Sequence, residues 1–115
     1  MIFHIADPTL YQAAEDSGSY KPVSFDTEGF IHCSDADQVA STLHRHFGGA
    51  DKLLLLAIDS EREKEYLRYE DLYKRGQEFP HLYRPLPLSS VLGTYVLERK
   101  GGMFRIPFEW MRSFG

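Results

Sequence analysis

The chain has 115 residues, of which 43% are hydrophobic and 26% charged, and its formal net charge is −4. This balance is typical of one globular domain with its own core, which excludes a fibrous or disordered chain, and the negative charge argues against nucleic-acid binding. A lone cysteine, Cys33, excludes an intrachain disulfide, and the longest apolar run, Leu53–Ile58, is too short to cross a membrane, so we expect one cytoplasmic domain over residues 1–115.

The first part of the chain predicts a strand followed by a helix. Residues 1–6 predict a strand with Ile2, His4 and Ala6 on one side and Phe3 and Ile5 on the other. Asp7 then caps a helix and Pro8 occupies its first position, where a missing N–H costs nothing. Gly18 ends this helix, and residues 18–28 are expected to form a loop.

A second strand and helix follow, and then a buried strand. Gly29–Cys33 predicts a short strand, and Ser34 or Asp35 caps the next helix. Apolar residues recur in this helix at the spacing of a core-facing side, at Val39, Leu43 and Phe47. The run Leu53–Ile58 predicts a strand that is buried on both faces.

The remainder of the chain predicts mostly strands. Residues 60–65 suit a helical turn, and 66–72 suit a strand, with a helix as the alternative. Three prolines and a glycine predict an ordered loop over 73–90. Residues 92–98 and 103–106 then predict a hairpin. We therefore expect an α+β fold with a small, twisted, mostly antiparallel sheet and two main helices.

Five histidines are the most informative polar residues. His4, His32 and His81 lie among apolar neighbours, so each must hydrogen-bond inside the protein or line a cleft. We expect at least one of the three in a ligand site. His44 and His46 lie two residues apart on a predicted helix, do not face each other, and are expected at the surface.

Three further observations limit the chemistry. Glu70 ends a predicted strand beside the loop that holds His81, a suitable place for catalysis or ribose binding. Cys33 and His32 are adjacent in a strand and point to opposite faces, so Cys33 is expected to be a small buried apolar residue. The chain has no His-x-x-x-His or Cys-x-x-Cys pair, and no metal is expected.

Several segments together resemble a known family. The segments are Ile2–His4, Glu28–Ser34 (Glu-Gly-Phe-Ile-His-Cys-Ser), Leu54–Asp59, Arg68–Glu70 and Phe79–Leu86 (Phe-Pro-His-Leu-Tyr-Arg-Pro-Leu). In this combination they resemble the family called domain of unknown function 952, over most of the chain. That family in turn resembles the ADP-ribosyltransferase-like fold, a split, twisted β structure that holds nicotinamide adenine dinucleotide (NAD) in a central cleft.

The resemblance implies roles for particular residues. In such transferases a first-strand histidine binds ribose, a tyrosine stacks on nicotinamide, and a late glutamate polarises the ribose. His4 and Glu70 match the first and third roles, whereas Ile31 or His32 stands in place of the tyrosine. This departure favours nucleotide binding over the full transfer reaction.

The candidate site follows from both arguments. The expected catalytic residues are His4, His32, Glu70 and His81. The expected binding residues are His4 and Ser34 for ribose, Phe30 or Tyr83 for a ring, and Arg84 for phosphate. The expected partner is a small nucleotide-like molecule, with NAD as a possible substrate. A non-catalytic nucleotide-binding module, a histidine-based hydrolase and a structural role remain as alternatives.

Overall fold

The main sheet of the protein has four antiparallel strands. The computed structural model describes all 115 residues. The strands lie in the order β1 (Ile2–Ala6), β4 (Lys52–Ile58), β8 (Val91–Lys100) and β9 (Met103–Phe104). Their pairing confirms the α+β class, the predicted first strand and the predicted hairpin near the end of the chain.

Both faces of β1 and β4 are buried, because these two strands alternate apolar side chains between two cores. On β1, Ile2 belongs to the first core and Phe3 to the second. On β4, Leu56 and Leu55 divide in the same way. The apolar run at 53–58 is therefore a strand buried on both faces, as predicted.

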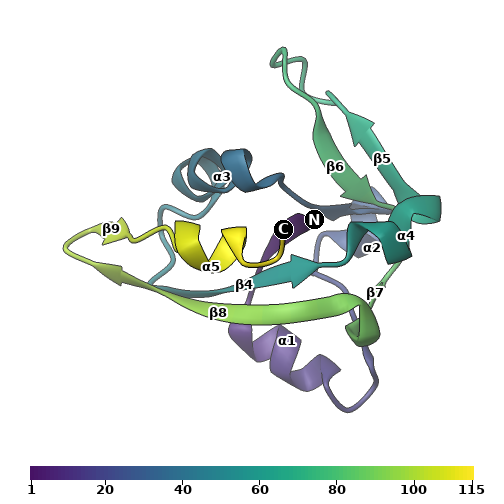
Figure 1. Cartoon of the computed structure of the whole chain (residues 1–115), viewed down its shortest axis with the longest axis horizontal. Helices are drawn as coiled ribbons and strands as arrows, with labels where there is room; N and C mark the ends of the chain where they lie inside the picture. Colours follow the sequence, from purple (N-terminus) through teal and green to yellow (C-terminus); the bar gives the residue numbers. More distant parts are fainter.

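Helices cover both faces of this sheet. α3 (Val39–His46) and α5 (Phe108–Arg112) contribute to the second core, and α1 (Pro8–Ala14) contributes to the first. Figure 1 shows α3 and α5 above β4 and β8, with α1 below them. With seven and eight residues, α1 and α3 are the longest helices and match the two main helices predicted.

Side-chain caps begin these two helices where the sequence predicts them. Asp7 accepts hydrogen bonds at 2.8 and 3.1 Å from two backbone N–H groups of α1. Asp35 caps a 3-10 turn (Ala36–Gln38) that leads into α3. Gln38 completes a capping box by accepting from the Asp35 backbone N–H at 2.9 Å. Both helix starts thus depend on contacts within a few residues.

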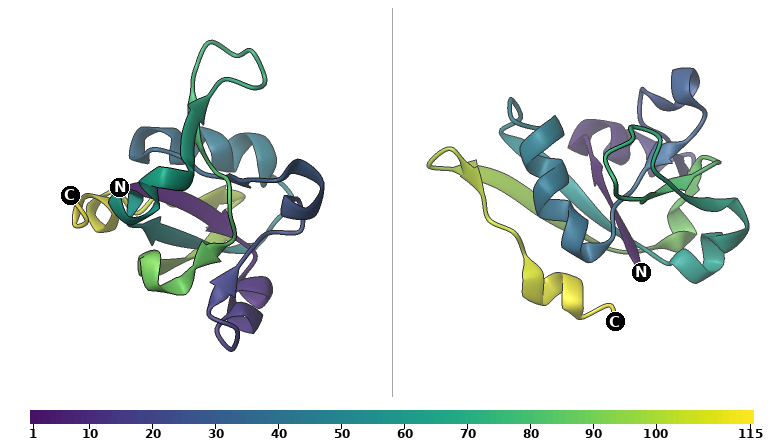
Figure 2. Two further views of the ribbon diagram at one scale, coloured as in Figure 1. Left: turned by 90° about the vertical axis from the view of Figure 1, so that its right-hand side faces the viewer. Right: turned by 90° about the horizontal axis from the view of Figure 1, so that it is seen from above.

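A second antiparallel sheet continues from the first. Its strands lie in the order β3 (Ile31–His32), β6 (Phe79–Leu82) and β5 (Leu67–Glu70). Phe3 of β1 and Ser34 exchange two backbone hydrogen bonds of 2.8 Å, which join the two sheets into one curled surface. Figures 1 and 2 show the β5–β6 hairpin projecting from the body of the protein.

The other elements are short and lie in the connections. They are β2 (Ser19–Tyr20) paired with β7 (Leu86–Pro87), α2 (Phe25–Glu28), α4 (Ser60–Glu63), and 3-10 turns at Lys64–Tyr66 and Leu88–Ser90. The prediction of a plain loop at 18–28 is wrong, because this segment forms β2 and α2. Gly29 ends α2 with a φ of 82°, a left-handed conformation that suits glycine. No helix combines the length and apolar composition that a membrane crossing requires.

A proline lies in the central strand of the second sheet, so the prediction of a loop over 73–90 is also wrong. Pro80 has no N–H to donate, and a proline normally argues against a central strand. Here β3 ends beside it. Cys33 still donates its N–H to the Pro80 carbonyl at 2.9 Å. The only hydrogen bond lost is the one that an N–H at position 80 would donate back to Cys33, just beyond the end of β3. The neighbouring segment 67–70 is a strand, which decides between the two predicted alternatives.

Candidate functional site

Two histidines face each other across the second sheet. His32 on β3 and His81 on β6 are direct cross-strand partners. The next pair, Cys33 and Pro80, is hydrogen-bonded, so the two histidines form a non-hydrogen-bonded pair, in which side chains lie closest. Their rings meet edge to face, with centroids 5.2 Å apart. Strand register alone therefore brings two imidazoles to one place.

His81 has one ring nitrogen fixed and one free. It is only 1% exposed, and its Nδ1 lies 3.0 Å from Glu70 Oε1. The Tyr83 hydroxyl donates to the same oxygen at 2.6 Å. Hydrogen bonds from Tyr83 and then His81 lower the pKa of Glu70, so the carboxylate is ionised and Nδ1 donates to it. Nε2 has no partner in the protein, yet it is not sealed from solvent, and His81 lines a pocket.

Burial keeps the imidazole of His81 in its neutral form, which can accept a proton. Loss of water around the ring lowers the pKa of His81, and the hydrogen bond to Glu70 opposes that shift only in part. The ring is therefore neutral near physiological pH. With its proton on Nδ1, the neutral imidazole of this pocket-lining residue has a free lone pair on Nε2. That atom can accept a proton from a bound molecule or from water.

His32 repeats this arrangement with a second glutamate. Its Nε2 lies 2.9 Å from Oε2 of Glu28, the last residue of α2. Tyr73, from the loop of the β5–β6 hairpin, places its hydroxyl 3.3 Å from the same nitrogen and stacks on the ring with centroids 6.0 Å apart. No protein group bonds to Nδ1 of His32. The site thus contains two histidine–carboxylate pairs, one buried and one half-buried.

His4 lines the same pocket but has both ring nitrogens engaged. Its Nδ1 lies 2.6 Å from the His32 carbonyl and its Nε2 lies 2.9 Å from the Tyr20 hydroxyl. A carbonyl only accepts, so Nδ1 donates and Nε2 accepts from Tyr20. Burial lowers the pKa of His4 to about 4. The three histidines predicted in apolar surroundings therefore converge, but His4 holds the β3 backbone in place and has no ring nitrogen to spare.

The pocket runs between α3, the end of β3 and the β5–β6 hairpin, with a volume of about 330 Å³. Two arginines contribute to its lining, Arg45 from α3 and Arg75 from the hairpin loop. Neither makes an ion pair within the protein. The one acidic lining residue, Glu28, already bonds to His32. The free cationic charge in the lining favours an anionic ligand.

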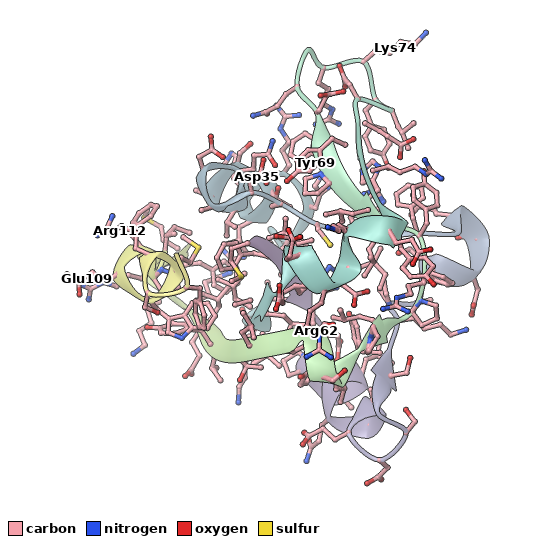
Figure 3. The ribbon with its side chains drawn as sticks, turned by 45° about the vertical axis from the view of Figure 1, so that its right-hand side comes forward. Asp35, Arg62, Tyr69, Lys74, Glu109 and Arg112 are labelled. Atoms are coloured by element: carbon pink, nitrogen blue, oxygen red, sulfur yellow. The ribbon has the colours of Figure 1, made fainter.

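The hairpin loop that carries Arg75 is held by its own side chains. Asp71 accepts hydrogen bonds at 2.8 Å from the backbone N–H groups of Arg75 and Gly76. Lys74 adopts a left-handed φ of 53° and lies at the tip, where Figure 3 shows it pointing to solvent. At the base of the hairpin, the Tyr69 hydroxyl donates to Asp35 at 2.7 Å (Figure 3). Strand β5 of the hairpin is therefore attached to the body beside α3.

The remaining predicted site residues take different places. Ser34 is buried, lines the pocket and bonds through its hydroxyl to Thr42 at 3.1 Å. Phe30 stacks on His81 with centroids 4.4 Å apart. Phe30, Glu70 and Tyr83 form a layer around His81 and are not part of the pocket lining.

Arg84 is the predicted residue that lies apart from the site. Its guanidinium makes two hydrogen bonds of 2.8 Å to Glu63, which is buried and also accepts from Ser90 at 2.6 Å. Arg84 does not line the pocket. Cys33 is buried as expected, and burial raises the pKa of its thiol, so the neutral thiol persists.

Sequence reasoning missed the cationic side of the pocket. Arg45, Tyr73 and Arg75 were not predicted, and His46, expected at the surface, is exposed but also lines the pocket. One local signal existed: Arg45 lies two residues beyond the buried Leu43, on the polar face of α3. For the loop residues no local signal exists, because hairpin geometry places them. No group of three or more His, Cys, Asp or Glu side chains is arranged to hold a metal ion.

Comparison with known proteins identifies relatives of unknown activity. The sequence model of the family described as "Protein of unknown function (DUF952)" matches residues 5–94. The crystal structure of protein CC0527 from Caulobacter crescentus is 33% identical, covers 90% of this chain and 92% of that one, and superposes with a TM-score of 0.82. The solution structure of CC0527, also 33% identical, covers 90% and 89% with a TM-score of 0.77. No curated protein matches the chain.

Proposed function

The chain belongs to the DUF952 family, and we propose that its pocket binds a nucleotide-like molecule, NAD or an ADP-ribosyl compound, and acts on it with His81 as general base. One observation carries this proposal. His81 is buried, its Nδ1 bonds to an ionised Glu70, and its Nε2 is the unpartnered atom beside the pocket. A neutral imidazole held in this way is a proton acceptor that works near neutral pH.

The ligand class is supported by charge and size. Arg45 and Arg75 lack ion-pair partners and suit the phosphates of a nucleotide, since guanidinium groups bind phosphate with two parallel hydrogen bonds. The aromatic ring of Tyr73 beside them suits a stacked base or ring. The pocket volume of about 330 Å³ lies at the lower end of the range of about 300–1,000 Å³ that is usual for ligand pockets.

The position of Glu70 supports a different role from the one that the resemblance implies. In ADP-ribosyltransferases the glutamate contacts ribose. Here Oε1 of Glu70 accepts from both Tyr83 and His81, and Glu70 lies behind His81 rather than in the lining. We assign it to orienting His81 and to stabilising the imidazolium that forms when Nε2 takes a proton.

The proposed chemistry takes place at the ribose carbon that carries the leaving group. Departure of that group produces positive charge on the ribose ring. His81 Nε2 takes a proton from the attacking water, whose oxygen bonds to the same carbon. Arg45 and Arg75 hold the phosphates, which fixes the ribose relative to His81. Each of these steps uses a side chain that lines the pocket.

Two measurements test this proposal. Amide NMR of isotope-labelled protein is recorded during titration with ADP-ribose and with NAD, and chemical-shift changes are expected to cluster at His32, His81 and Arg45. Incubation with either ligand is then followed for product release. The variant His81→Gln should bind as before and lose turnover by about 10²–10⁴-fold. Absence of shifts at millimolar ligand would contradict the proposal, and binding without turnover would reduce it to a non-catalytic nucleotide-binding module.

A further inference from the structure

The two histidine–carboxylate pairs of the site are not equivalent. His81 is 1% exposed, whereas the side chain of His32 is 37% exposed and its Nδ1 is free. Glu28 lies 2.9 Å from Nε2 of His32, so a second proton on Nδ1 produces an imidazolium that directly faces a carboxylate. Two titratable groups in different environments at one site are the usual arrangement of an acid and a base.

A second proton-carrying group has consequences for the substrate. Nicotinamide leaves NAD as a neutral base, because the positive charge on its ring nitrogen accepts the electron pair of the broken bond. That departure requires no proton. An alcohol, in contrast, leaves as a strongly basic alkoxide unless an acid protonates its oxygen during bond cleavage. A site with a base and an acid therefore suits a leaving oxygen better than it suits nicotinamide.

Building on the proposed function, we infer that His32 is the general acid of this site and that its substrate is an ADP-ribosyl group linked through oxygen at the ribose anomeric carbon, which the protein hydrolyses. The two rings lie edge to face with centroids 5.2 Å apart, and both residues line the same pocket. Phe30 packs against both rings, with centroids 4.4 and 4.8 Å away, and keeps them in this relation.

The reaction balances without any further reagent. The water oxygen forms a bond to the anomeric carbon, and the bond from that carbon to the leaving oxygen breaks. The electron pair of the broken bond stays on the leaving oxygen, which takes the proton from Nδ1 of His32. Nε2 of His81 takes a proton from the water. The products are ADP-ribose and a free alcohol, and exchange with solvent returns each histidine to its first state.

The test compares substrates that differ only in the leaving group. ADP-ribose linked to the serine of a short peptide has a poor leaving oxygen, and ADP-ribose linked to 4-nitrophenol has a good one. We expect His32→Gln to slow hydrolysis of the serine compound by about 10²–10⁴-fold and of the nitrophenyl compound by less than about tenfold. His81→Gln should slow both. The exposed His44→Gln serves as the matched control and should slow neither.

The outcomes separate this inference from the proposed function. Turnover of the nitrophenyl compound by His32→Gln shows that the variant is folded and binds ligand. Equal losses on both compounds, or release of nicotinamide from NAD faster than cleavage of the serine compound, would overturn the role of His32. Binding of ADP-ribose without hydrolysis of either compound would also overturn it. If ADP-ribose produces no amide shifts at all, the proposed function itself fails.

Discussion

His32 and His81 lie opposite each other on β3 and β6, and each bonds through one ring nitrogen to its own glutamate. The distance between their Cβ atoms is set by the backbone, because cross-strand partners in a sheet cannot separate without breaking the ladder. The glutamates come from different elements, Glu28 from α2 and Glu70 from β5. The pair of imidazoles is therefore built by the sheet, and α2 and β5 determine what each ring can do.

The tautomer of His81 is a direct prediction of this geometry. Nitrogen NMR of the labelled protein should show a neutral imidazole with the proton on Nδ1 at about pH 7.5, because Glu70 accepts from that atom. Glu70→Gln should give a mixture of tautomers, since an amide can either donate or accept. The exposed Glu65→Gln is the control and should leave the spectrum of His81 unchanged. A proton found on Nε2 of the wild-type protein would contradict the assignment.

His4 should make the stability of the protein sensitive to mild acid. Its pKa in the folded state is lowered to about 4, below the ordinary value of about 6.5. The unfolded chain therefore binds the proton first. The free energy of unfolding should be fully maintained above about pH 6.5, and should fall between pH 6.5 and 4 by up to about 3 kcal/mol from this residue.

Urea unfolding at several pH values measures this effect. The lowered pKa of His81 adds to the fall in the same direction, so the difference between wild type and His4→Gln isolates His4. The variant should be less stable at neutral pH and should lose less stability on acidification. The exposed His46→Gln should retain the wild-type slope. Parallel curves for wild type and His4→Gln would show that His4 is not the responsible group.

The ion pair of Glu63 and Arg84 should contribute strongly to the stability of the fold. Burial raises the pKa of Glu63, but hydrogen bonds from Arg84 and Ser90 outweigh it, and the net pKa is lowered. Glu63 is buried and Arg84 is 33% exposed, so Glu63→Ala should cost about 3 kcal/mol in urea unfolding, the lower end of the range for breaking a buried pair. Glu61→Ala breaks the exposed pair with Lys64 and should cost less than about 1 kcal/mol. Similar losses in both variants would contradict the structural role assigned to Arg84.

The two free arginines should determine affinity for phosphate-containing ligands. Arg45→Met and Arg75→Met should each weaken ADP-ribose binding by about tenfold or more, since a charged hydrogen bond contributes about 1.5–3 kcal/mol. Calorimetric titration measures this loss, with Arg112→Met on α5 as the control (Figure 3). Binding of adenosine, which has no phosphate, should be unaffected. An equal loss for adenosine would show that the variants disturb the pocket rather than remove a phosphate contact.

Prediction from the sequence succeeded where neighbouring residues decide the outcome. The start of α1 at Asp7 and the two-sided burial of β4 follow from a cap and from apolar patterning. The strand β6 was missed because its proline is tolerated only where β3 ends, and no residue near Pro80 signals that end. The apolar surroundings of His4, His32 and His81 predict at least one of them in a ligand site, and the structure places all three at one pocket.

Neighbouring residues in the sequence do not predict the hydrogen-bond or ion-pair partner of each polar side chain. Sequence motifs assigned a phosphate to Arg84, but folding gives it Glu63, 21 positions earlier, and leaves Arg45 and Arg75 free at the pocket. A buried imidazole needs a hydrogen-bond partner, whatever its neighbours in the sequence. Strand register and the curl of the joined sheets select the group that satisfies it, because contacts between distant segments form only when the whole core packs.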